Sequence, residues 1–297
     1  MKICFKQIRI CISYRRKLLI DSIPEEQIAY SNLTEMEKEL PYQLIGVGCD
    51  FHQHPVDRPF GYPTYQWIQT YKGYGILHMK GDDYRVPVNH GMLLYPGDAH
   101  EYRETDEIWN VHWITFNGYH IERMLHKLGF DQSGVYPVSD ASLLSSHIHK
   151  GLQLIRQGTA LSGLDGSVLI YQFLFDLYRG VQIGGGMSKN DKASRLKPVF
   201  DYINRNLDHV ITVDELSKIN GITPQHFCVL FKEITGLRPM EYINSHRIKL
   251  AKDLLLREPS LHVSDVGKRV GFDNNSYFST IFRKFEGVSP RQYKDLH

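Results

Sequence analysis

Two short segments in the last third of the chain place amide, hydroxyl and basic side chains on the polar side of an apolar helical pattern. Amide and hydroxyl groups read base edges in the major groove of DNA, whereas lysine and arginine bind phosphate oxygens. One such row is commonly just a solvated helix face, but its repetition favours DNA binding. The residues of the first segment are Thr223, Gln225, His226, Cys228, Val229 and Lys232. Those of the second are Asn274, Asn275, Ser276, Ser279, Thr280, Arg283 and Lys284.

The apolar residues around these two segments also repeat. The pattern that runs from Ile211 to Tyr242 recurs about 50 residues further along, from Leu261 to Tyr293. In each copy the spacing i, i+3, i+4, i+7 buries one side of a helix, and a glycine interrupts the pattern. We interpret each copy as a helix-turn-helix unit. The inward residues expected in the second helix of each unit are Phe227, Leu230, Phe231 and Ile234, and Phe278, Ile281, Phe282 and Phe285.

Residues at the expected helix ends support this interpretation. Thr212 and Glu215 have the spacing of a capping box, in which each side chain accepts a hydrogen bond from the other residue's backbone amide. Gly221 and Gly271 stand where the first helix of each unit must end in a left-handed residue. The expected N-caps of the second helices are Thr223, which precedes Pro224, and Asn274.

A single helix is expected between the two units, from Pro239 to Arg257. At about 1.5 Å per residue it spans roughly 28 Å, close to the ~34 Å of one DNA turn. This length would let the second helix of each unit enter consecutive major grooves on one side of the duplex. The residues expected to face inward are Tyr242, Ile243, Ile248, Leu250, Ala251, Leu254 and Leu255.

The run from Val266 to Lys294 resembles the signature of the AraC/XylS family of bacterial transcription regulators. The match lies in its Val-Gly-Lys-Arg-Val-Gly-Phe, Ser-Tyr-Phe-Ser and Gly-Val-Ser-Pro-Arg-Gln-Tyr-Lys segments, and it extends roughly over residues 195 to 297. The resemblance implies a seven-helix DNA-binding domain. Many members carry arginine at the positions of Val229 and Thr280 and alanine at Gly267, so their operator sequences do not transfer. The base-reading positions that the resemblance implies are Gln225, Cys228, Val229, Asn275, Ser276, Ser279 and Thr280.

Length and charge predict a two-part protein. The 297 residues suffice for two domains of ordinary size. Residues 191 to 297 contain 17 lysines and arginines against 13 acidic residues, whereas residues 21 to 190 contain 12 against 20. A basic half beside an acidic half suits a DNA-binding domain joined to a domain that stays off DNA. We expect an N-terminal arm over 1–40, a ligand-binding and dimerisation domain over 41–182, a glycine-rich linker over 183–191 and the DNA-binding domain over 192–297.

The first 20 residues carry six basic and no acidic side chains. These charges interrupt the apolar stretches, which argues against a signal peptide or membrane span. An ordered arm, a disordered tail and a misassigned start remain open, and the arm is preferred. The cysteines show neither metal-ligand spacing nor a disulfide framework, which fits four unconnected thiols in a reducing cytoplasm. They are Cys4, Cys11, Cys49 and Cys228.

Residues 41 to 118 are rich in short β-type runs separated by turn signals, at the spacings expected of a small β-barrel or sandwich. Such a barrel can hold one small ligand. Three motifs in this segment resemble the cupin-type sensor domain of sugar-responsive AraC relatives: Arg58-Pro-Phe-Gly, the run from Gly91 to Tyr102, and the run from Trp109 to Phe116. The resemblance implies a sugar site formed by Arg58, Tyr102 and Trp113. Val111 replaces a common histidine, so the particular sugar does not transfer.

Enzyme chemistry finds little support in the sequence. His52, His54 and His100 are similar to a cupin metal motif, but the glutamate expected after the histidine pair is missing. No nucleophile elbow surrounds any serine or cysteine. We therefore expect no catalytic residue, no metal and no cofactor. A metal-dependent cupin enzyme fused to a DNA-binding domain and a ligand-independent DNA binder remain as alternatives.

The apolar pattern becomes helical again between Val138 and Val181, where the helices either cap the barrel or also form a dimer surface. The predicted fold is a multi-domain α and β protein. It has an N-terminal cupin-like β-barrel with a helical dimerisation segment and a C-terminal all-α domain with two helix-turn-helix motifs. The expected function is sequence-specific transcriptional regulation, controlled by a small molecule, most simply a sugar. Expected partners are double-stranded DNA, this effector and a second copy of the chain, with RNA polymerase left open and membranes excluded.

Overall fold

The computed structural model describes residues 27–105, 108–184 and 186–296. The chain divides into two compact units, Met1–Lys189 and Asn190–His297. The division lies inside the segment 183–191 that the sequence predicts as a linker, and helix α5 (Lys189–Arg205) already begins within it. Most of the predicted N-terminal arm, together with Cys4 and Cys11, lies outside the described residues.

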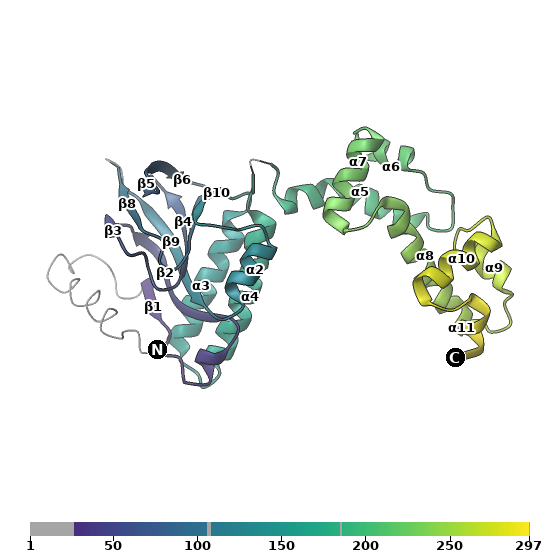
Figure 1. The fold of residues 1–297 in the computed structure, drawn as a ribbon, viewed down its shortest axis with the longest axis horizontal. Helices are drawn as coiled ribbons and strands as arrows, with labels where there is room; N and C mark the ends of the chain where they lie inside the picture. The colour runs from purple at the N-terminus through teal and green to yellow at the C-terminus, as the bar shows by residue number, and fades with distance from the viewer. Residues whose placement is uncertain (1–26, 106–107, 185, 297) are drawn as a thin grey trace. The chain divides into compact units, whose positions relative to one another are not determined.

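The first unit is built on two antiparallel sheets (Figure 1). The six-stranded sheet has the order β1-β2-β9-β4-β7-β10, and the four-stranded sheet has the order β3-β8-β5-β6. The strands are β1 (Ile28–Tyr30), β2 (Gln43–His52), β3 (Val56–Arg58), β4 (Tyr65–Lys72), β5 (Tyr74–Met79), β6 (Asp82–Pro87), β7 (His90–Leu94), β8 (His100–Glu104), β9 (Asn110–Asn117) and β10 (Gly134–Pro137). A short 3-10 helix, η2 (Glu37–Glu39), precedes β2. The strands predicted between residues 41 and 118 are therefore present.

The six-stranded sheet is buried on both faces. Along β9, Val111 and Trp113 belong to the apolar cluster between the sheets, whereas Ile114 and Phe116 belong to the cluster on the opposite face. This alternation follows from the two-residue period of a strand. Strand β9 thus presents one face to the barrel interior and the other to the helices.

Three helices cover the outer face of this sheet: α2 (Ile121–Lys127), α3 (Ala141–Gln157) and α4 (Ser162–Gly180) (Figure 1). Helix α3 begins at Asp140, whose carboxylate accepts a hydrogen bond from the Leu143 amide at 3.1 Å. Gly151 on α3 allows close packing, since a Cβ there would lie 3.1 Å from a methyl of Val47. The predicted helical segment therefore does cap the barrel.

The described part of the second unit contains seven helices around two apolar cores. They are α5, α6 (Val213–Asn220), α7 (Pro224–Thr235), α8 (Pro239–Arg257), α9 (Val263–Arg269), α10 (Asn275–Glu286) and α11 (Pro290–Leu296). Helix α8 has the predicted bounds and joins the two cores: Ile243 packs in the first, and Ile248 and Ala251 pack in the second. Among the described helices of the whole chain, none is long and apolar enough to cross a membrane.

Two residues predicted to face inward are exposed. Leu250 on α8 is 41% exposed, because the buried side of this helix follows Ile248, Ala251 and Leu255, and position 250 points away from it. Phe285 is also 41% exposed. It lies in the last turn of α10, and the helix ends one residue later, before Gly287.

Candidate nucleic-acid interface and ligand pocket

The first helix-turn-helix unit consists of α6 and α7, and its turns follow the predicted capping chemistry. The Thr212 amide donates to Glu215 Oε2 at 2.9 Å, and the Glu215 amide donates to Thr212 Oγ1 at 3.2 Å. Helix α6 ends at Gly221, whose φ of 69° is left-handed. Thr223 then caps α7, with Pro224 in its first turn. Phe227 and Phe231 lie on the inner side of α7, and their full burial orients the helix.

The opposite side of α7 is open. Gln225, His226, Val229 and Lys232 are exposed, as is the cap residue Thr223, and Cys228 is half-buried. Val229 is 68% exposed and presents an aliphatic side chain on this face. An exposed aliphatic group here can contact a thymine methyl, whereas Gln225 can form the paired hydrogen bonds that adenine accepts and donates.

The second helix-turn-helix unit consists of α9 and α10 and repeats the first. Asn274 caps α10 by accepting a hydrogen bond from the Tyr277 amide at 2.9 Å, as predicted. Phe278 and Phe282 are fully buried. A Cβ on Gly267 would lie 3.0 Å from Cδ1 of Phe278, so α9 and α10 pack so closely at this position that even alanine would be tight. This close packing explains why glycine stands at position 267, where many members of the resembled family carry alanine.

The open side of α10 carries the remaining predicted residues. Asn274, Asn275, Ser276, Thr280, Arg283 and Lys284 are exposed, and Ser279 is half-buried. The Thr280 hydroxyl donates to the Ser276 carbonyl oxygen at 2.9 Å, so its methyl group is the more available contact. The polar residues predicted from the repeat therefore lie on two corresponding helix faces.

Within the C-terminal unit, a buried arginine on the connecting helix α8 links the two helix-turn-helix units. Arg247 is 6% exposed; its Nε donates to the Leu207 carbonyl at 2.9 Å and its Nη2 to the His209 carbonyl at 2.6 Å. Its guanidinium lies 5.5 Å from the ring centre of Phe272, in the second unit. The sequence analysis missed this residue. A signal was present, since Arg247 follows Ile243 by four residues and precedes Ala251 by four, on the buried side of α8.

The N-terminal unit of the chain contains a cavity between its two sheets, and the three residues implied as a sugar site all line this cavity. The guanidinium of Arg58 donates to Gln66 Oε1, and its Cζ lies 4.3 Å from the ring centre of Tyr62 and 5.7 Å from that of Tyr102. Tyr102 and Trp113 are 2% and 8% exposed. The complete lining is Tyr30, Phe51, Gln53, Arg58, Tyr62, Gln66, Ile68, Tyr102, Trp113 and Thr115.

Polar residues that the sequence analysis did not select also reach this cavity. Gln53 and Gln66 are 4% and 5% exposed, and Thr115 is 1% exposed. The sequence did contain a signal for Gln66. It lies two residues before Ile68 on β4, so it shares the inner side of this strand, where a polar side chain indicates a polar cavity. The free volume of about 30 Å³ accommodates only a few water molecules, so a larger ligand requires lining side chains to move.

The histidines of the proposed cupin motif are only partly together in the structure: His52 and His54 form one group of possible metal ligands with Glu104, and His100 lies outside it. His52 Nε2 lies 3.2 Å from Glu104 Oε2, and His54 is next to His52 with ring centres 4.5 Å apart. His100 is not part of this group: its Nδ1 lies 2.7 Å from the Asp98 carbonyl oxygen. Burial lowers the pKa of His100 and favours its neutral form.

Comparison with known proteins matches both units. Residues 43–174 match the AraC-like ligand binding domain, and residues 216–295 match a helix-turn-helix domain. The chain is 26% identical to the lactose operon transcription activator of Staphylococcus xylosus, over 75% of this chain and 81% of the relative. It is also 26% identical to the arabinose operon regulatory protein of Salmonella typhimurium, over 80% of this chain and 86% of the relative.

These matches and the two exposed helix faces define a DNA-binding transcriptional regulator with a ligand-binding domain. The chain belongs to the AraC family.

Proposed function

We propose that a sugar or sugar derivative bound between the two sheets controls how this regulator engages its operator. The observation that carries the proposal is the convergence of Arg58, Tyr102 and Trp113 on one cavity. An arginine offers forked donors to ring and hydroxyl oxygens, tyrosine both donates and accepts, and an indole covers the C–H side of a pyranose. Gln53 and Gln66 add amide donors and acceptors. The names of the relatives that regulate lactose and arabinose operons support the same class of effector.

On DNA, we infer that α7 and α10 enter consecutive major grooves. Helix α8 comprises 19 residues, which corresponds to about 28 Å of helix against ~34 Å for one turn of the duplex. Gln225 and Asn275 are the side chains suited to adenine, and Lys232, Arg283 and Lys284 are suited to phosphates. The effector acts by favouring one arrangement of the protein over another, with a coupling free energy of ~1–3 kcal/mol, the range typical of coupling between two binding sites.

We further propose that the regulator is a homodimer that pairs through α4. The residues Leu161, Leu164, Val168 and Tyr171 are 60%, 37%, 57% and 44% exposed. Their spacing of three, four and three residues is that of a coiled-coil seam, and they begin at the N-cap of α4. A row of large apolar residues on the side of α4 that faces away from the sheet favours pairing with a second copy. A dimer would present four recognition helices to two half-sites.

The effector proposal is tested by measuring thermal unfolding of the full chain with a panel of sugars. We expect at least one sugar to raise the midpoint for the wild-type protein and to lose this effect with Arg58→Gln. The matched control is Arg85→Gln, because Arg85 lies on β6 against Tyr74 and outside the cavity. A sugar response that survives Arg58→Gln unchanged, or a panel without any response, contradicts the proposal.

A further inference from the structure

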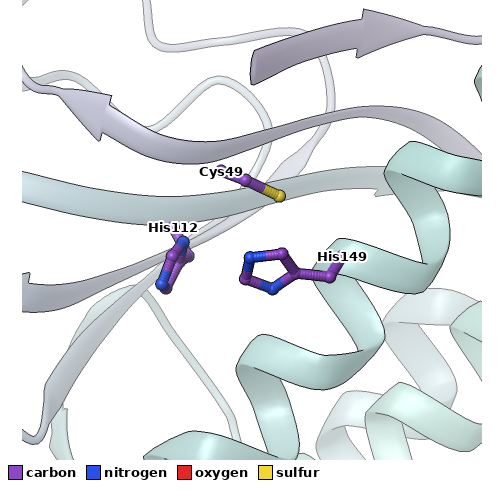
Figure 2. A group of neighbouring side chains, drawn as sticks. All are labelled: Cys49, His112 and His149. Carbon is purple, nitrogen blue, oxygen red and sulfur yellow. The ribbon is translucent and has the colours of Figure 1, made fainter. Parts of the chain in front are cut away.

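Three potential metal ligands meet on the outer face of the six-stranded sheet. Cys49 lies on β2, His112 on β9 and His149 on α3, and one ligand atom from each lies within 4.8 Å of the others (Figure 2). Figure 2 shows the His149 ring extending from its helix toward the other two side chains. The ring centres of His112 and His149 are 5.0 Å apart. Residues distant in sequence thus form one compact group of soft and borderline donors.

The hydrogen bonds of His149 leave one of its nitrogens available. Its Nδ1 lies 2.8 Å from the Ser145 carbonyl oxygen, which can only accept a hydrogen bond. In the neutral ring Nδ1 then carries the proton, and Nε2 is the nitrogen with the lone pair. An imidazole that donates one N–H to a backbone carbonyl is the usual arrangement of a metal-binding histidine, since this bond fixes both the tautomer and the ring orientation.

His112 is held in place and is neutral. It is 5% exposed and its ring stacks on Tyr71, with ring centres 4.5 Å apart and planes 15° from parallel. Burial lowers the pKa of His112, which favours the form that binds metals. The Asp50 amide donates to its Nδ1 at 3.1 Å, so this nitrogen is unprotonated. An ion on Nδ1 would have to displace only this single hydrogen bond.

Cys49 supplies the donor that determines which ion is preferred. Its side chain is buried, and burial raises the pKa of the thiol to about 11, so the free thiol is a poor nucleophile at neutral pH. A reactive-cysteine role is therefore disfavoured. A bound metal ion removes the thiol proton and makes the thiolate a ligand. One thiolate and two imidazoles select Zn²⁺ or Cu⁺ over Mg²⁺ or Ca²⁺, which prefer oxygen.

We propose that Cys49, His112 and His149 bind a thiolate-preferring transition-metal ion, with Zn²⁺ as the typical occupant. Three protein ligands leave a further coordination position for a water molecule. His149 is exposed, which gives an ion access from solvent. The bound ion connects α3 to two strands of the sheet.

The test uses the full chain, purified without a histidine tag and stripped of metal. Zn²⁺ affinity is measured by competition with a chromophoric chelator, and Co²⁺ is added as a spectroscopic probe of thiolate coordination. We expect one equivalent of tightly bound Zn²⁺ and a thiolate-to-cobalt absorption band. With His149→Gln we expect the affinity to fall by at least about 100-fold and the band to disappear. Because His149 is exposed, this variant should fold normally.

Two further variants separate this site from other histidines and thiols. His54→Gln is the matched control, because His54 belongs to a second group with His52 and Glu104. Cys228→Ser controls for the half-buried thiol of α7. Both should retain the thiolate band, whereas Cys49→Ser should lose it. Binding of Cu⁺ rather than Zn²⁺ by the same three residues also supports the proposal. Absence of the band in the wild-type protein, or its persistence in His149→Gln, overturns it.

Discussion

The indole of Trp113 lies directly against the backbone of Gly48. The two residues are opposite each other in the β2–β9 pairing, and a Cβ on Gly48 would come within 2.2 Å of the indole Nε1. Contacts this close do not occur between real atoms, so only glycine allows the ring its present position. Trp113 also lies 5.9 Å from Tyr30, measured between ring centres. The position of this aromatic wall of the cavity is therefore set by a missing side chain on the neighbouring strand.

Replacing Gly48 with alanine should impair effector binding without impairing DNA binding. The new methyl group forces the indole away from β2, which changes the cavity wall. We expect Gly48→Ala to reduce the sugar-induced rise in unfolding midpoint, while the affinity for operator DNA without effector stays unchanged. Gly134→Ala is the matched control, because a Cβ at this position in the same sheet makes only ordinary contacts, the nearest at 3.4 Å. A normal sugar response in Gly48→Ala would contradict this prediction.

The recognition helices should contribute separately to base reading and to phosphate binding. Gln225→Ala or Asn275→Ala should each weaken operator binding by ~1–3 kcal/mol, with a smaller effect on unrelated DNA. Arg283→Gln should instead weaken binding to all sequences. It should also lower the slope of log affinity against log salt concentration by about one. Fluorescence anisotropy over a range of salt concentrations measures both effects.

Lys249 on α8 provides the charge control for Arg283, because it is exposed and lies outside the two recognition helices. Lys249→Gln should leave the affinity nearly unchanged. If Gln225→Ala weakened operator and unrelated DNA equally, α7 would not be reading bases.

Removal of the buried arginine should destabilise the C-terminal unit. Arg247→Met leaves the carbonyls of Leu207 and His209 without their charged donor, at a cost of ~3 kcal/mol in the free energy of unfolding. Arg257→Met, at an exposed position of the same helix, should change this free energy by no more than about 0.5 kcal/mol. Urea unfolding followed by circular dichroism compares the two variants. Equal stability of both would show that Arg247 does not hold the units together.

The proposed dimer should depend on the exposed side of α4. Val168→Glu places a charge in the middle of the apolar row, where burial against a second copy would be costly. We expect the wild-type protein to elute as a dimer and this variant as a monomer in size-exclusion chromatography with light scattering. Asp165→Glu, which keeps the charge on the same helix, is the control. A monomeric wild-type protein would refute the dimer, and a dimeric Val168→Glu would refute this surface.

The C-terminal fold was predictable because its determinants are local. Thr212, Gly221 and Asn274 act on their own helix ends, and the buried phenylalanines repeat at helical spacing. The prediction of an inward side chain was wrong for Leu250 and Phe285. Leu250 lies on the exposed side of α8, and Phe285 lies in the last turn of α10. The position of each residue on its helix, and not its residue type, sets its exposure.

The sites of the N-terminal unit were less accessible to sequence reasoning. Arg58, Tyr102 and Trp113 were grouped only through a family resemblance, since spacing alone does not show that β3, β8 and β9 surround one cavity. The group of Cys49, His112 and His149 gave no sequence signal, because it depends on the register of β2 against β9 and on the seating of α3. Such long-range geometry is fixed by the fold as a whole.

The most direct test of the central claim is footprinting of the full-length regulator on the DNA upstream of its own gene and neighbouring genes. We predict two protected major-groove segments per protein copy, about one helical turn apart on the same side of the duplex. Asn275→Ala should remove protection from one segment and Gln225→Ala from the other. Binding no tighter than to random duplex at moderate salt, or protection of a single segment only, would contradict the account.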